Sequence, residues 1–208
     1  METYVRSAFA GMLITIAATI FLMTPNPILG SFFFSIGLLA IVHYGFLLFT
    51  GFVGYLPVEI DKFTYAGQCF QVWTWNFFGA VLTGLLIRST YIYPIIQERV
   101  LCLMDFKTSI SIQDLIVLGF FCGILMFIAT NSWKYGANPV SKIVILILCV
   151  MVFINCKFEH CVANMAYFIL AVNKQNFLDT AFAVLMTSIG NIFGCCLIPF
   201  FNPKLIRV

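Results

Sequence analysis

The sequence predicts an all-α integral membrane protein with six transmembrane helices arranged as two inverted three-helix repeats. Three observations predict this fold class. The 208 residues are 62% hydrophobic and only 9% charged, with a mean hydropathy of +1.04, whereas soluble domains are about 45–50% apolar and about 25% charged. Six stretches are apolar enough to cross a bilayer. The second and the fifth are interrupted by polar residues at matching places in the two halves.

The six stretches follow from apolar length, because a spanning helix needs about 20 mostly apolar residues. We expect one membrane domain, residues 1–208, with a first repeat at about 1–95 and a second at about 105–205. The stretches cover approximately residues 7–23, 28–56, 65–90, 112–131, 142–172 and 177–201.

The first stretch has one feature of a signal peptide, since Arg6 precedes a short apolar segment. A secreted protein would continue into soluble sequence after such a segment. This chain continues into further apolar stretches, so Arg6 is expected to flank the first spanning helix.

The second and fifth stretches are too long for one straight crossing. They are interrupted by "HYGFLLFTG" at 43–51 and by "KFEHCVAN" at 157–164. Interrupted segments in matching positions of two halves predict broken helices that meet near the middle of the bilayer. Irregular backbone at that depth requires protein or an aqueous cavity around it.

The third and sixth stretches support the repeat, because "WNFFGAV" at 75–81 and "GNIFGCC" at 190–196 share the pattern Asn-x-x-Gly. Three crossings in each half would make the halves inverted with respect to the membrane.

The distribution of basic residues favours a cell-membrane protein with both termini on the cytoplasmic side. The net charge of +3 is small and no Lys/Arg cluster occurs, so a nucleic-acid partner has no support. With the N-terminus inside, Arg6, Lys62, Lys134, Lys142, Lys204 and Arg207 would be inside, and Arg88, Arg99, Lys107 and Lys174 outside.

The eight cysteines are interpreted as reduced packing residues. Nearly all of them lie in apolar stretches, Cys195 and Cys196 are neighbours, and no CxxC motif occurs. No cofactor is expected from them.

The fifth stretch places Lys157, Glu159 and His160 inside an apolar run. Inserting an ionisable residue at the centre of a bilayer costs at least about 2.5–3.5 kcal/mol of free energy. Glu159, with Asn164, is expected to satisfy exposed backbone of the broken helix. His160 is expected to be functional, because an imidazole on a pore axis donates a hydrogen bond or a proton to a passing weak acid. Lys157 either attracts anions or pairs with a carboxylate, such as Glu159 or one on another helix, and the sequence leaves both open.

These residues carry a resemblance to a known family. "FEHCVANM" at 158–165 and "GNIFG" at 190–194, with "FSIGL" at 34–38, "LFTG" at 48–51 and "WNFFGA" at 75–80, resemble the formate/nitrite transporter family over essentially the whole membrane domain. The resemblance implies a homopentamer in the lipid bilayer, an aquaporin-like subunit and one pore per subunit. It also implies that the substrate is a small monovalent anion of a weak acid, such as formate, nitrite, hydrosulfide, acetate or lactate, with or without a proton.

The resemblance also implies roles for particular residues. His160 corresponds to the central histidine, Thr50 to the threonine that hydrogen-bonds it, and Asn191 to an asparagine that lines the pore. The cytoplasmic constriction would contain Phe34, Leu38 and Phe49, and the outer constriction Phe153 and Met126.

Three departures from the family pattern leave the substrate and the electrostatics of the pore mouth open. Leu47 stands where an acidic residue is usual, and Lys157 stands where glycine is common. The segment "LGFFCGIL" at 118–125 lacks the Cys-Asn pair and the preceding basic residue found in many members.

Two other classes of function remain as alternatives. A membrane metalloenzyme could use Glu159, His160, Cys156 and Cys161, but His43 is the only other histidine, and metal sites need more such ligands. A pore for neutral solutes fits the architecture, although the Asn-Pro-Ala pairs of an aquaporin are absent and "NPI" and "NPV" lie in predicted loops. The chain is therefore not expected to be an enzyme.

Overall fold

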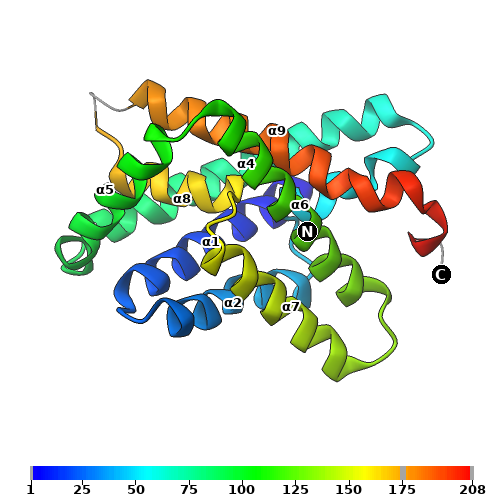
Figure 1. Ribbon diagram of the computed structural model, residues 1–208, viewed down its shortest axis with the longest axis horizontal. Coiled ribbons are helices and arrows are strands. Elements are labelled where there is room, and N and C mark those ends of the chain that lie inside the picture. The colour runs from blue at the N-terminus through cyan, green and yellow to red at the C-terminus, as the bar shows by residue number, and fades with distance from the viewer. Residues whose placement is uncertain (1, 174–176, 207–208) are drawn as a thin grey trace.

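The computed structural model describes residues 2–173 and 177–206, and over this range its regular structure is entirely helical (Figure 1). Four helices are long and apolar enough to cross a membrane: α1 (Thr3–Met23), α4 (Lys62–Arg88), α6 (Ile112–Tyr135) and α9 (Phe177–Phe201). They correspond to the first, third, fourth and sixth predicted stretches; α1 begins four residues earlier than expected, and α4 ends two residues earlier.

Shorter apolar helices occupy the second and fifth stretches. In the first half, α2 (Pro27–His43) precedes α3 (Phe49–Phe52) and the 3-10 helix η1 (Val53–Val58). In the second half, α7 (Pro139–Asn155) precedes α8 (Cys161–Ala171). Both α2 and α7 have 17 residues, so each is about 26 Å long at 1.5 Å per residue, less than the bilayer core of about 30 Å.

The two Asn-Pro sequences explain where α2 and α7 begin. The Asn26 side chain accepts hydrogen bonds from the amides of Ile28 and Leu29, and Asn138 caps the start of α7 in the same way. Proline follows each asparagine at the first helical position, where its missing N–H costs nothing. The same start signal therefore opens the matching helix of each half.

Helix α5 (Ile92–Ser109) was not among the predicted elements, which left this region as a connection between the halves. Its buried residues, Ile96, Val100, Met104 and Lys107, lie three or four positions apart and thus on one face. This face packs against α8 and α1. The helix is amphipathic and carries several charges, so apolar length alone does not reveal it. A second short 3-10 helix, η2 (Pro203–Ile206), follows α9.

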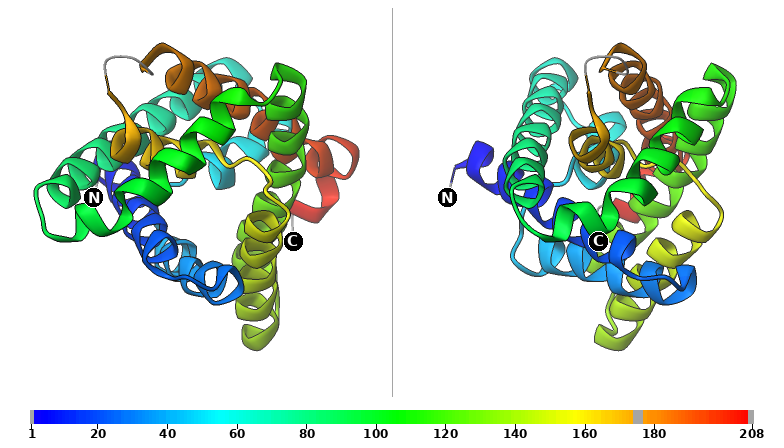
Figure 2. Two further views of the ribbon diagram at one scale, coloured as in Figure 1. Left: turned by 60° about the vertical axis from the view of Figure 1, so that its left-hand side comes forward. Right: turned by 90° about the vertical axis from the view of Figure 1, so that its left-hand side faces the viewer.

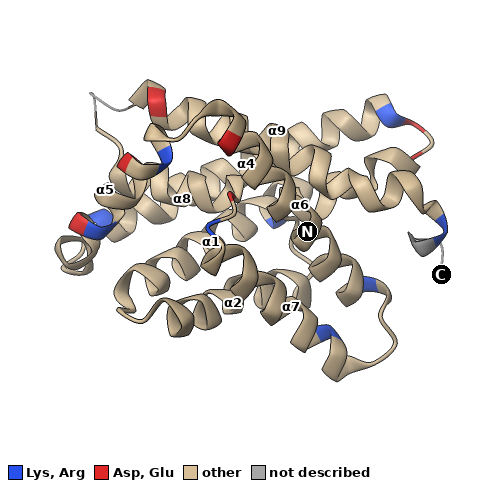
Figure 3. Ribbon diagram, in the orientation of Figure 1, with Lys and Arg blue, Asp and Glu red and all other residues tan. Residues whose placement is uncertain are grey.

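Helix α8 lies at the centre of the molecule, between α1 and α4 on one side and α5 and α9 on the other (Figures 1 and 2). All eleven of its residues are buried. The closest helix pairs are α1 with α4 and α6 with α9, which hold equivalent places in the two halves, and α2 packs against α7 between them. Figure 3 shows that most charged residues lie toward the ends of the molecule.

Candidate functional site

The two breaks, after α2 and after α7, have the same backbone path. Each turns at a residue with positive φ, Gly45 at 68° and Lys157 at 56°. After each turn a backbone amide bonds back into the preceding helix at 2.8 Å, from Phe46 to Ile41 and from Phe158 to Phe153. The breaks are therefore ordered structures built by matching contacts.

Two asparagines from α4 and α9 hold the breaks in place. Asn76 donates to the carbonyl oxygens of Ser7 and Leu47 and accepts from the amide of Phe49, at 2.7–2.9 Å. Asn191 donates to the carbonyl oxygens of Gly119 and Glu159 and accepts from the amide of Cys161, at 2.7–2.8 Å. Both N–H groups of each amide are used on backbone. These residues are the asparagines of the two Asn-x-x-Gly patterns.

His160 lies at the start of α8 and is 2% exposed. Its Nδ1 accepts the Ala163 amide at 3.0 Å and so caps the helix. A backbone amide can only donate, so Nδ1 carries no proton and the neutral ring has its proton on Nε2. Nε2 lies 3.0 Å from Oγ1 of Thr50, which is fully buried in the first turn of α3. The imidazole therefore donates to Thr50, and the hydroxyl proton of Thr50 remains available to another acceptor.

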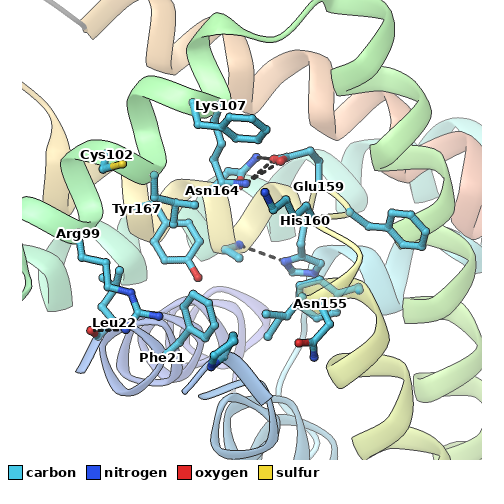
Figure 4. A pocket seen from close by; sticks show the side chains of 18 of the residues that line it. Phe21, Leu22, Arg99, Cys102, Lys107, Asn155, Glu159, His160, Asn164 and Tyr167 are labelled. Atoms are coloured by element: carbon cyan, nitrogen blue, oxygen red, sulfur yellow. Dashed lines mark hydrogen bonds and ion pairs between the residues drawn. The ribbon is translucent and has the colours of Figure 1, made fainter. Parts of the chain in front are cut away.

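Glu159 forms a buried ion pair with Lys107 of α5. The Lys107 Nζ lies 2.7 Å from both carboxylate oxygens, and Nδ2 of Asn164 donates to Oε2 at 2.7 Å. Figure 4 shows Lys107 and Asn164 both directed toward Glu159. Three hydrogen bonds satisfy a carboxylate that would otherwise be buried without a partner.

A cavity of about 850 Å³ lies beside these groups. It reaches from exposed residues, including Lys157, to the buried His160. Its wall contains the ion pair of Lys107 with Glu159, and also Asn164, whose buried Oδ1 has no hydrogen-bond partner. Apolar side chains such as Phe21 and Leu22 form much of the remaining wall (Figure 4), which also includes Phe153.

Comparison with known proteins identifies the family. The sequence pattern of the family described as formate/nitrite transporter matches residues 1–202. The chain belongs to the formate/nitrite transporter family. The predicted resemblance is thereby confirmed, and so is the prediction of a membrane protein with an all-helical fold. No protein with a curated function matches the chain by sequence.

Solved structures share the formate/nitrite transporter fold at low identity. One, described as a pentameric formate channel with formate bound, is similar with a TM-score of 0.84 and 22% identity, covering 99% of this chain and 96% of that chain. Another, described as an FNT family ion channel, has a TM-score of 0.86 and 22% identity, covering 97% and 88%. At this identity the likeness establishes the fold.

The structure brings together two apolar residues that the family pattern assigns to different constrictions. Phe34 was expected to share a constriction with Phe49, away from Phe153. Its ring instead lies 5.8 Å from that of Phe153 in edge-to-face contact, and Phe153 lies 5.6 Å from the His160 ring. The reason is that α2 packs alongside α7. Leu38 and Met126, like these phenylalanines, are buried.

The structure excludes one pairing that was considered for Lys157. Glu159 is paired with Lys107, so the proposed pairing of Lys157 with Glu159 is wrong. Within the described part of the chain Lys157 forms no ion pair, and its Nζ lies 5.1 Å from the centre of the Phe106 ring. Two other basic residues counted for orientation, Lys174 and Arg207, lie outside the described residues.

Sequence reasoning missed Lys107 and Asn76 as members of this site. Lys107 was counted as an outer flanking charge. It follows Met104 at helical spacing on the apolar face of α5, and this spacing could have indicated that it is buried. Asn76 was noted only for its pattern shared with Asn191, which was itself expected to line the pore. The hydrogen bonds of Asn191 to the carbonyl oxygens of Gly119 and Glu159 hold the second break in place.

The cysteines and the possible metal ligands show no common site. All eight cysteines are free, and Cys102 and Cys156 are exposed on the single chain. Among the described residues no group of three or more His, Cys, Asp and Glu side chains could hold a metal ion.

Proposed function

We propose that this member of the formate/nitrite transporter family is a channel for small monovalent anions of weak acids. The observation that carries the proposal is the buried contact of His160 with Thr50 beside a cavity that reaches the surface. Formate, nitrite and hydrosulfide are small enough to use such a contact. A solved structure with the same fold, described as a formate channel with formate bound, supports the substrate class.

The proposed architecture has six crossings in a single domain. In each half the first and third crossings are the long helices, α1 and α4 or α6 and α9. The second crossing combines α2 with α3 and η1, or α7 with α8. Three crossings per half make the repeats inverted, as matching hydrogen bonds around Asn76 and Asn191 support. Both termini then lie on one side, which we assign to the cytoplasm of a cell membrane.

Anion passage is proposed to depend on hydrogen-bond donors inside an apolar frame. A hydrated ion cannot cheaply pass buried aromatic rings such as Phe34 and Phe153, because an unpaired charge is costly to bury. Next to these rings, His160 Nε2–H donates to the Thr50 hydroxyl, which in turn supplies a donor to the anion, and the N-terminus of α8 adds a favourable dipole. A small anion can exchange its water for these donors, whereas a strongly hydrated ion loses more than it gains.

His160 is proposed to act as a neutral hydrogen-bond donor. Protonation of Nδ1 would set its N–H against the Ala163 N–H and break the cap of α8. The proton of a permeating acid therefore comes with the acid or from solvent. Asn164 lines the cavity and its buried Oδ1 has no hydrogen-bond partner, so we propose this oxygen as the acceptor of a hydrogen bond from a neutral acid.

The functional subunit is proposed to be one of five in a homopentamer. Many large apolar side chains are exposed on the single chain, including Phe33, Phe70 and Phe193, and both lipid and neighbouring subunits would cover them. The pentameric neighbour of the same fold supports this assembly. Native mass spectrometry from mild detergent tests it: we expect five chains per particle, and a monomer or dimer alone would contradict it.

Flux into proteoliposomes tests the substrate class. Formate, nitrite, hydrosulfide, acetate and lactate should be compared from pH 5 to 8, with glycerol as the neutral solute and protein-free liposomes as the control. We expect protein-dependent uptake of at least one small anion. Glycerol uptake without anion uptake would establish a neutral-solute pore and reject the proposal.

A further inference from the structure

Lys157 has a backbone conformation that ordinarily belongs to glycine. Its φ of 56° makes it the only described non-glycine residue with positive φ. Side chains with a Cβ atom rarely adopt this region because of steric conflict with the backbone. Such outliers persist where the surrounding structure imposes them, often at functional sites.

The chain supplies its own comparison for this position. In the first half Gly45 occupies the matching turn, with a φ of 68°. Both turns are followed by the same backbone bonds, and both breaks are held by an asparagine. The fold therefore requires a left-handed residue at both places, and only the second half has a charged side chain there. Glycine adopts this conformation at lower cost, so the turn itself does not require the lysine side chain.

The charge of Lys157 is unbalanced within the described structure. Lys157 is exposed and lines the cavity that ends at His160. Lys107 lines the same cavity, but its charge is neutralised by Glu159 at 2.7 Å. The two other charged residues in the wall are Glu98 and Arg99, and Arg99 donates to the carbonyl oxygens of Leu22 and Thr24.

We propose that Lys157 is an anion-capture residue at the cavity that leads to His160, and that it sets the affinity of this side of the protein for its anions. This inference rests on the proposed function. The ammonium group raises the local concentration of monovalent anions and leaves the later steps past His160 unchanged. Its effect is long-range and electrostatic, so it depends on ionic strength.

The central experiment compares Lys157→Met with wild type for formate uptake at low salt. Methionine keeps an unbranched side chain and removes the charge. We expect the half-saturating formate concentration to rise about three- to tenfold. This is the loss of affinity expected when one positive charge at roughly 8 Å from the anion is removed, at an effective dielectric constant between those of the protein surface and water. The maximal flux should stay within about twofold. Lys157→Arg should retain the wild-type affinity and Lys157→Gly should match the methionine variant.

Ionic strength separates capture from a structural role. At 0.5 M salt the screening length is about 4 Å, so wild type and Lys157→Met should converge. The matched control is Lys134→Met, which removes an exposed lysine that also lies against an aromatic ring, Tyr55, but does not line the cavity. It should leave the half-saturating concentration unchanged at every salt concentration.

Charge restoration provides a second, independent test. Lys157→Cys is made in a background with Cys102→Ser and Cys156→Ser, which removes the exposed native thiols. A methanethiosulfonate reagent with a positive group should restore the low half-saturating concentration, and a reagent with a negative group should raise it further. Equal effects of the two reagents would reject capture by charge.

The results distinguish this inference from the proposed function. If wild type carries no small anion, the proposed function fails. If wild type carries formate and Lys157→Met has the same half-saturating concentration and salt dependence, only the capture role fails. A loss of maximal flux in Lys157→Met that salt does not change also rejects it.

Discussion

His160 makes two hydrogen bonds, one that caps a helix and one that joins the two breaks at the proposed anion path. Nδ1 caps α8 by accepting the Ala163 amide, and Nε2 faces Thr50 across the two breaks. The cap fixes which nitrogen carries the proton, so the donor always points toward Thr50. A single side chain thus orders the start of a fully buried helix and presents a donor beside the cavity.

Replacement of His160 by asparagine or phenylalanine tests the neutral-donor role. Asparagine is a good helix cap and keeps an N–H donor, so His160→Asn should retain flux within about tenfold and keep the wild-type pH profile. Phenylalanine offers neither, and a lost hydrogen bond to a charged group is worth about 1.5–3 kcal/mol, so flux should fall about 10- to 100-fold. Proteoliposome uptake of formate from pH 5 to 8 measures both. If formate uptake by His160→Asn no longer depended on pH while uptake by wild type did, His160 would instead be the group that exchanges a proton with the permeating acid.

The ion pair of Lys107 with Glu159 makes a second prediction for individual residues. Lys107→Met leaves a buried carboxylate without its counter-charge, which should destabilise the protein by about 3–5 kcal/mol. The double variant Lys107→Met with Glu159→Leu removes both charges and should recover much of that loss. Thermal unfolding in detergent gives the comparison. A double variant as unstable as the single one would show that the pair contributes more than charge balance.

Among the helices, each break is held by an amide from a neighbouring long helix. Asn76 ties the first break to α1 and α4, and Asn191 ties the second to α6 and α9. The halves differ in the residues that these amides enclose. Leu48 lies between the bonds in the first half, and His160 lies between them in the second. A common frame therefore positions an apolar residue on one side and the imidazole on the other.

Asn76→Ala tests whether this frame positions Thr50. The change leaves the Phe49 amide and two carbonyl groups without their partner, at a cost of about 1–3 kcal/mol or more. We expect a lower melting temperature together with reduced anion flux, because Thr50 follows Phe49 directly. Thr74→Ala is the matched control, since Thr74 is on the same helix, is half-buried and donates its side-chain hydrogen bond within α4. Normal flux in Asn76→Ala would show that Thr50 does not depend on this bond.

Across the molecule as a whole, each half contains a pair of long helices that pack very closely against each other. A Cβ atom on Gly79 would lie 2.0 Å from the carbonyl oxygen of Ala8, and one on Gly194 would lie 2.0 Å from that of Phe120. The matching glycines bring α4 against α1 and α9 against α6. Small residues allow helices in membranes to pack closely, and here they also set the distance at which the asparagines reach the breaks.

Gly194→Ala is therefore expected to damage folding far more than an equivalent change elsewhere. A carbonyl oxygen of the backbone cannot move aside, so α6 and α9 must separate, which should lower the melting temperature by several degrees and weaken the Asn191 bonds. Gly67→Ala is the control, because nothing lies within 4 Å of a Cβ atom there. Fluorescence-detected size-exclusion chromatography after heating measures both. Equal stability of the two variants would contradict the close packing.

The amino-acid sequence alone predicts the all-helical membrane class, the positions of the long helices and the two interruptions near Phe46 and Phe158. These features are local: apolar length, Asn-Pro caps and polar residues within apolar runs act on their own segment of chain. The shared Asn-x-x-Gly pattern also identifies Asn76 and Asn191 as equivalent. What each asparagine bonds could not be derived from the pattern, because its partners lie on other helices.

Which distant residues meet depends on the packing of the helices. The folded chain pairs Glu159 with Lys107 instead of Lys157 and places Phe34 against Phe153. It also leaves the charge of Lys157 unbalanced at the cavity. These outcomes depend on how each helix is rotated and how closely it packs against its neighbours, and small residues such as Gly79 and Gly194 set that closeness. No sequence window contains both partners of such a contact, so the fold must form before the chemistry of the site is defined.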